Sequence, residues 1–402
     1  MSDYCKSYVL CVLAKKCELF FTFFKDVGWA YLSYYVVCSM EESMVMDRHP
    51  GQASRSAIWS IPRVVSELVE RGTMEDGLTD LVRSLERADR LFVVGTGSSY
   101  YAAQLGAYAL RDAGCDAWAL PAFEFVEYPR PLRARDLVLV VSHRGNKRYS
   151  VEALKRGFEA EIPTVLLTGR PTRYSGTPPQ HLIFTVPQEV SSMHTVSMIA
   201  AAVMLDCMGC AVAELRQGTQ KAYRNSLTTL GTLLDGALTC EAQVEQVAAA
   251  VAERRARCFF VGGGPAAVAS SEGALKVKEG AYLTAEGIDV ESMLHGPMMS
   301  VEAADCAVVV APEGPSFGRA CDVVRALREF GTAVWWLSDH EPPVGVDWMT
   351  VLPTTLERHW IFSAIVVLDL FAWHLALACH TDPDGFRLEH EQYRRGYQTI
   401  VL

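Results

Sequence analysis

The 402-residue sequence lacks an excess of positive charge: 37 lysines and arginines stand against 47 aspartates and glutamates, and the net charge is −10 at pH 7. Nothing in this balance favours nucleic acid as a partner, so any phosphate binding is expected to be local. The sequence also lacks low-complexity and collagen-like stretches. Its 50% hydrophobic content is typical of globular proteins, and its length suffices for two domains.

Metal-ligand spacing is absent as well. The 12 cysteines are scattered, and no C-x2-C pair is followed by a second pair or by spaced histidines. The close pair Cys207 and Cys210 lies in the apolar run 199–212, which favours buried thiols. We therefore predict no metal site and no cofactor, and a reducing, cytoplasmic compartment.

No segment has the uninterrupted pattern of a signal peptide. Lys25 and Asp26 split the aromatic-rich and cysteine-rich first 45 residues, for which membrane association stays open but is not favoured. We interpret residues 1–54 as an extension and expect a chain without residues 1–43 to fold and dimerise. The apolar run 360–379 contains Asp369 and His374, which favours a buried helix over a membrane span.

The remaining chain contains an internal repeat. Segments 91–124 and 258–291 both read as an apolar strand, a glycine-rich turn and a helix, and Gly97 and Gly264 are 167 residues apart, as are Glu124 and Glu291. Further apolar strands are predicted at 137–141, 163–167, 182–186, 307–311 and 332–337. Apolar strands that alternate with helices are typical of parallel sheets covered on both faces. We predict two α/β domains of three layers, flavodoxin-like, at 55–215 and 216–402.

Two places in the first copy could hold a phosphate. Ser98 and Ser99 follow Gly97 at a predicted helix start, where backbone N–H groups and hydroxyls suit a compact phosphomonoester, and the missing third glycine of the dinucleotide fingerprint opposes a nucleotide. Ser142 ends the next strand, and a hydroxyl and three fixed positive charges stand within 142–148. A solvated turn explains this second stretch equally well. The corresponding residues 312–315 of the second copy carry no such groups.

The second copy carries acid–base residues instead. Glu272, Lys276 and Glu279 are spaced i, i+4 and i+7, so they share one helical face. An exposed salt-bridged stripe is one interpretation. The other is that these residues meet an imidazole, His295, in one pocket, which is the minimum set for moving a proton next to a carbonyl group.

The segment Glu272-Gly-Ala-Leu-Lys276-x-Lys-Glu279, with His295-Gly-Pro after it, resembles the catalytic segment of the double sugar isomerase (SIS) domain family, which includes the isomerase half of glucosamine-6-phosphate synthase. The resemblance covers about residue 56 to the C-terminus. It implies that Glu279 shuttles a proton between C1 and C2 of an open-chain sugar phosphate, that Lys276 stabilises the enediol or enolamine, that Glu272 orients Lys276 and that His295 assists ring opening.

The resemblance also implies a homodimer with shared active sites, because the family's histidine reaches the neighbouring subunit. It implies a set of substrate-binding residues: Gly97, Ser98, Ser99, Ser142, His143, Arg144, Lys147, Ser191, Thr195 and Arg387. The loop Ser142-His143-Arg144-Gly-Asn-Lys147 departs from the family's Ser-Gln-Ser-Gly-Glu-Thr, since two hydroxyl positions have become cationic.

Two further absences narrow the expected function. The first 55 residues cannot form a glutaminase domain, and no lysine follows Lys278 to form an imine with a ketose. We expect a phosphosugar isomerase, or a deaminating or deglycating isomerase, that works by enediol or enolamine proton transfer without its own glutaminase. The alternatives are a non-catalytic phosphosugar sensor, favoured by the altered loop, and a nucleotide-dependent enzyme.

Overall fold

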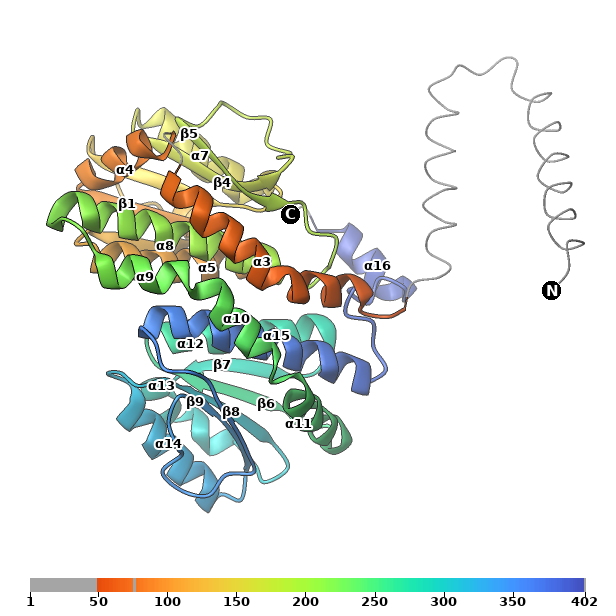
Figure 1. Ribbon diagram of the computed structural model, residues 1–402. Helices are drawn as coiled ribbons and strands as arrows, with labels where there is room; N and C mark the ends of the chain where they lie inside the picture. The colour runs from red at the N-terminus through yellow and green to blue at the C-terminus, as the bar shows by residue number, and fades with distance from the viewer. Residues whose placement is uncertain (1–48, 75–76, 401–402) are drawn as a thin grey trace, which may run out of the picture. The chain divides into compact units, whose positions relative to one another are not determined.

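The computed structural model describes residues 49–74 and 77–400. The expectations for residues 1–45 lie outside this part of the chain. Two helices, α3 (Gln52–Met74) and α4 (Gly77–Arg87), precede the first sheet (Figure 1).

The first sheet consists of five parallel strands in the order β2-β1-β3-β4-β5. Its elements are β1 (Arg90–Gly95), α5 (Ser98–Asp112), β2 (Ala117–Pro121), α6 (Ala122–Glu127), β3 (Asp136–Val141), α7 (Arg148–Glu159), β4 (Thr164–Arg170), β5 (His181–Pro187) and α8 (Val196–Gln217). This is the flavodoxin-like order, so the predicted fold of this half is confirmed.

The second sheet repeats that order as β10-β9-β8-β6-β7, again with all strands parallel. Three helices lead into it: α9 (Lys221–Thr228), α10 (Leu230–Leu238) and α11 (Glu241–Arg254). It comprises β6 (Cys258–Gly262), α12 (Pro265–Gly280), β7 (Ala285–Asp289), α13 (Val290–Leu294), a 3-10 turn (Pro297–Ser300), β8 (Cys306–Ala311), α14 (Phe317–Glu329), β9 (Ala333–Ser338) and β10 (Trp348–Val351). The chain continues as α15 (Glu357–Ala378) and α16 (Glu391–Gln398).

Strand alternation divides the side chains between layers. In β1, Leu91 and Val93 point into a core shared with α5, α8, α12 and α15, whereas Phe92 and Val94 point to the opposite face, covered by α6 and α7. Figure 1 shows α12 and α15 on the face of the second sheet that is turned towards the first domain. The shared core therefore joins the two repeats, and α5 packs directly against α12.

The glycines of the repeated turns adopt matching backbone conformations. Gly97 has φ 58° and ψ −134°, and Gly264 has φ 59° and ψ −128°; each precedes the helix that follows the first strand of its sheet. Residues other than glycine rarely adopt this combination of φ and ψ. The sequence repeat is thus a structural repeat.

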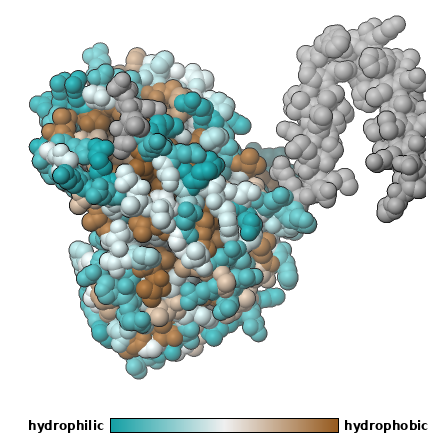
Figure 2. Space-filling model, in the orientation of Figure 1, coloured by the Kyte–Doolittle hydropathy of each residue, from teal (hydrophilic) through white to brown (hydrophobic). Residues whose placement is uncertain are grey.

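Two helices, α8 and α15, are long and apolar enough to cross a membrane. However, 94% and 89% of their most apolar windows are buried inside the protein. The helix predicted over 360–379 is confirmed as α15, with Asp369 and His374 both buried. The face of the protein shown in Figure 2 mixes hydrophilic residues with scattered hydrophobic ones.

Candidate functional site

Lys276 lies at the contact between the two domains and joins three side chains. Its Nζ donates hydrogen bonds to Glu279 Oε2 (2.8 Å) and to Ser98 Oγ (2.9 Å), and it lies 3.2 Å from Glu272 Oε1. Ser98 is the first residue of α5 in the first domain, whereas the other three residues belong to α12. One ammonium group thus links the helix start that follows β1 to the acid-rich face of α12.

The predicted helical face is confirmed, but it is not an exposed stripe. Lys276 is fully buried and Glu272 is 1% exposed, while the Glu279 side chain retains 18% exposure. Small residues make this burial possible, because a Cβ on Gly273 would lie 3.0 Å from Leu368 of α15. Glu279 is therefore the member of the set that a solute can reach.

The charges of this cluster depend on one another. Burial lowers the pKa of Lys276, but Glu272 and Glu279 raise it above its usual value, so Lys276 stays cationic. Burial also raises the pKa of Glu272, an effect that the charge of Lys276 opposes. The cluster is stable as a unit, and removal of the ammonium group would leave buried carboxyl groups without compensation.

The loop 142–148 lies at the carboxyl ends of the central strands of the first sheet. Ser142 is buried directly after β3, and Lys147 is the half-buried residue before α7. Within residues 49–74 and 77–400, neither Arg144 nor Lys147 forms an ion pair with a carboxylate, and burial together with Arg144 lowers the pKa of Lys147. Ligands of such sheets bind where the strand order reverses, here between β1 and β3, and this edge offers them positive charge.

His143 links two loops. Its Nε2 accepts a hydrogen bond from the N–H of Glu189 (2.8 Å), and burial together with His194 lowers its pKa to about 4, so the ring is neutral at pH 7. The Glu189 carboxylate in turn accepts from the N–H groups of Thr195 (2.9 Å) and Ser197 (3.0 Å). Burial raises the pKa of Glu189, but its hydrogen bonds and His194 hold it at about 2.

Ser191 and Thr195 are both buried and hydrogen-bonded within the protein. Ser191 Oγ lies 2.7 Å from Ser54 Oγ, and Thr195 Oγ1 donates to Glu189 (3.3 Å). In this structure the two residues hold the loop 189–195 in place.

Arg387 lies in the C-terminal tail. Its guanidinium group stacks on Tyr282 and Tyr393 and lines a cavity of about 610 Å³ together with His380 and His390. The tail is fastened to the end of α12, because Thr381 Oγ1 donates to Gly280 O (2.8 Å). This hydrogen bond holds the tail segment that carries Arg387 against the helix of Glu279, but among the described residues no hydrogen bond or ion pair joins Arg387 to the Lys276 cluster.

His295 stands apart from that cluster in the described chain. Its side chain is 71% exposed, and Nε2 lies 2.9 Å from Glu291 Oε1, which also binds Arg319. The structure therefore does not bring the imidazole to Lys276 within one chain.

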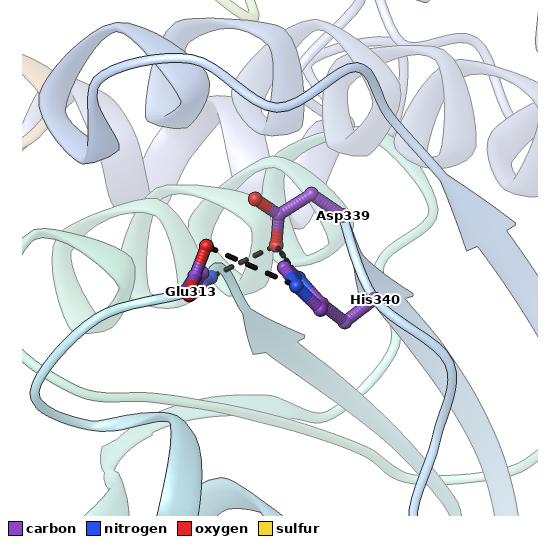
Figure 3. A group of neighbouring side chains, drawn as sticks. All are labelled: Glu313, Asp339 and His340. Carbon is purple, nitrogen blue, oxygen red and sulfur yellow. Dashed lines mark hydrogen bonds and ion pairs between the residues drawn. The ribbon is translucent and has the colours of Figure 1, made fainter.

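Three side chains at the carboxyl ends of β8 and β9 lie close enough together to hold an ion: Glu313, Asp339 and His340 (Figure 3). Asp339 Oδ1 already accepts from the N–H of Glu313 (2.8 Å) and lies 3.0 Å from His340 Nδ1. These contacts already pair the three side chains with partners in the protein, so we assign no metal to them.

Comparison with known proteins defines the class. Residues 84–208 match the SIS domain, so this part of the chain is a SIS domain, and the chain is homologous to the SIS half of glutamine–fructose-6-phosphate aminotransferases. The aminotransferase of Pyrococcus horikoshii is 24% identical over 331 residues, which are 81% of this chain and 55% of the relative. The chain thus spans about half the length of the curated relatives it matches.

Solved structures share the fold. The C-terminal domain of glucosamine-fructose-6-phosphate aminotransferase from Francisella tularensis superposes with a TM-score of 0.76 at 20% identity, covering 84% of this chain and 98% of that one. The tagatose-6-phosphate ketose/aldose isomerase from Escherichia coli gives a TM-score of 0.69 at 18% identity, with coverage of 84% and 98%. Both share the fold of this chain, with two parallel sheets that each lie between helices.

Two residues that matter to the site were not identified from the sequence. Glu189 organises the loop before α8 by accepting hydrogen bonds from the N–H groups of Thr195 and Ser197, whereas the resemblance pointed only to Ser191 and Thr195 in that loop. Asp369 lies among the groups that interact electrostatically with Glu272 and Lys276. Its signal in the sequence is a carboxyl group within an apolar run, which by itself argues only against a membrane span.

Proposed function

We propose that this chain is a phosphosugar isomerase, or a deaminating or deglycating isomerase, in which Glu279 moves a proton between C1 and C2 of an open-chain sugar or amino-sugar phosphate. The observation that carries the proposal is the Lys276 cluster. It connects the one accessible carboxylate of α12 with a hydroxyl at the phosphate-binding end of the first sheet.

In the proposed reaction, Glu279 takes the proton from the carbon next to the carbonyl group, and an enediol or, with an amino sugar, an enolamine forms. The same carboxyl group then returns the proton to the former carbonyl carbon. The carbonyl oxygen gains a proton as the enediol forms and the neighbouring hydroxyl loses one as it collapses, so aldose and ketose interconvert with no net change in protons. Lys276 is fully enclosed. It acts by holding Glu279 and Ser98 in place and by placing a fixed positive charge beside the negative charge that develops on the substrate.

The phosphate group would bind at the loop 142–148. Ser142, the Ser98–Ser99 helix start and the cations Arg144 and Lys147 stand at that edge, and no carboxylate of the described residues pairs with either cation. His143 would stay neutral and would hold this loop in place through its hydrogen bond with the N–H of Glu189. Gly97 leaves open space above the turn, since a Cβ there would meet nothing within 4 Å.

His295 would serve a second copy of this chain. It is exposed rather than directed at Lys276, and in the resembling family the corresponding histidine enters the neighbouring subunit's site. We therefore include a cytoplasmic homodimer with shared active sites in the proposal, with Arg387 and the C-terminal tail closing the end of α12.

Proton NMR in heavy water tests the proposal. Fructose-6-phosphate, glucosamine-6-phosphate and a fructosamine-6-phosphate are incubated with the wild-type protein and with Glu279→Gln. We expect solvent deuterium to appear at C1 or C2 of at least one compound with the wild type only. Binding of a phosphosugar by both proteins without any deuterium exchange would contradict the proposed isomerase and would favour a phosphosugar-binding sensor.

A further inference from the structure

Asp369 is a buried carboxyl group that the proposed mechanism does not use. It lies in the middle of α15 with 1% exposure, and neither oxygen has a hydrogen-bond partner in the described part of the chain. Asp206, a second buried aspartate, contrasts with it, because its oxygens lie 2.6 Å from both Tyr223 Oη and His359 Nε2. An ionised carboxylate needs such partners when it is buried, and Asp369 has none.

Asp369 lies near the Lys276 cluster, because its carboxyl group interacts electrostatically with Glu272, Lys276 and Glu279. Helix α15 packs against α12, and their close approach lies at Gly273 and Leu368, the direct neighbours of Glu272 and Asp369. Glu272 is equally enclosed, and the cation that it pairs with among the described residues is Lys276, at 3.2 Å. Two buried carboxyl groups on facing helices therefore depend on one ammonium group.

The charges in this space cannot all be present at once. If Glu272 and Glu279 are both ionised, the single positive charge of Lys276 balances only one of the two negative charges. Ionisation of Asp369 would add a second negative charge without a partner. Burial and the neighbouring Glu272 raise the pKa of Asp369 well above its usual value. Since Glu272 is the carboxyl group that touches Lys276, Asp369 is the one that keeps its proton.

The other elements around α15 do not change this balance. Their charged groups nearest to this stretch are Glu189 before α8, Asp235 on α10, Glu241 and Glu245 on α11, and Arg55 on α3. Glu189 raises the pKa of Asp369 further, and Asp235 is exposed. The Arg55 guanidinium stacks on Trp59 and Trp373, and Glu241 lies 3.5 Å from His374.

We propose that Asp369 is held as a neutral carboxylic acid and is a positioning residue for Lys276, whose charge it leaves free to act on Glu279 and the substrate. The inference rests on the proposed function for its role in turnover, although not for the protonation state itself. Ionisation of Asp369 at high pH would place a further negative charge near Lys276. It would weaken the stabilisation of a negatively charged enediolate, so turnover falls at alkaline pH.

Infrared spectroscopy of the whole protein tests the protonation state without any substrate. At pH 7 exposed carboxyl groups are ionised, so the carbonyl stretch of protonated carboxyl groups reports the buried neutral ones. We expect this band in the wild type, a clear loss of it in Asp369→Asn and its persistence in Asp206→Asn, the matched buried but hydrogen-bonded control. Equal bands in the wild type and Asp369→Asn would overturn the inference.

The pH dependence of deuterium exchange tests the role in turnover. Asp369→Asn is permanently neutral and nearly isosteric, so we expect a rate within about 2-fold of the wild type at pH 7 and an alkaline limb moved upward by at least about one pH unit. Asp369→Leu, which is also neutral, should behave alike if the asparagine variant folds poorly. If the alkaline limb of the pH–rate profile is unchanged in these variants, Asp369 contributes only to packing and has no role in turnover. An infrared band without any turnover would refute the proposed function and leave the neutral acid in place.

Discussion

Replacement of Lys276 by methionine is the perturbation whose cost follows most directly from the structure. The change keeps an unbranched side chain one atom shorter than lysine but leaves Glu272 buried without a cation. That carboxyl group must then take up a proton, and a group with an ordinary pKa of 4.5 costs about 3 kcal/mol to keep protonated at pH 7, at about 1.4 kcal/mol per pH unit. Loss of the hydrogen bond to Ser98 adds about 1 kcal/mol.

The same reasoning predicts that the cost shrinks in acid. At pH 5 protonation of Glu272 costs less than about 1 kcal/mol, because the solution pH is then close to the ordinary pKa. Urea unfolding at pH 7 and pH 5 measures the difference, and the double variant Glu272→Gln, Lys276→Met should recover most of the loss at pH 7.

The chain offers a matched control. Arg63 and Glu67 form an ion pair with the same i, i+4 spacing, but their side chains are 68% and 61% exposed. Arg63→Met is therefore expected to cost less than about 1 kcal/mol at either pH. A loss of stability in Lys276→Met that equals the control, or that does not depend on pH, would refute the argument.

Two further predictions concern buried polar groups. The His143 ring should titrate by NMR with a pKa of about 4. Between pH 6.5 and pH 4 the folded state then binds fewer protons than the unfolded state, so the free energy of unfolding should fall by about 2–3 kcal/mol as the pH drops over this range. His143→Gln should make the free energy of unfolding depend less on pH in this range. A midpoint near 6.5 would contradict the buried, hydrogen-bonded ring. Tyr223→Phe removes a 2.6 Å hydrogen bond to the Asp206 carboxylate and should cost about 2 kcal/mol in urea unfolding, whereas a neutral effect would show that the network of Asp206 re-forms without it.

Continuous apolar runs predicted the strands that form the interior of each sheet and also β5, which lies at the edge of the first sheet. The strands β2, β7 and β10, which the sequence did not predict, all lie at sheet edges. They are short, and in β2 and β7 buried and exposed residues are mixed, as in the sequence Ala-Glu-Gly-Ile-Asp of β7. These three edge strands carry a weak pattern because one side of each has no neighbouring strand to bury it, whereas β5 keeps a continuous apolar run at its edge.

The site could be predicted only where helical spacing defines it. The spacing of Glu272, Lys276 and Glu279 predicted their shared face, but the contact of Lys276 with Ser98 joins residues 178 positions apart and follows from how the two repeats pack. His143 illustrates the opposite difficulty. Its place in the phosphate loop suggested a ligand, while the structure engages its ring with Glu189, a partner that no local pattern could reveal.

A crystal structure of Glu279→Gln with a bound phosphosugar tests the central claim most directly, since the variant should bind the sugar without turning it over. We predict that the phosphate group lies against Ser142, the Ser98–Ser99 helix start and Lys147, and that C1 and C2 lie within about 3–3.5 Å of the residue 279 side chain. A sugar bound instead in the cavity lined by Arg387, or with its carbonyl end away from α12, would contradict the account.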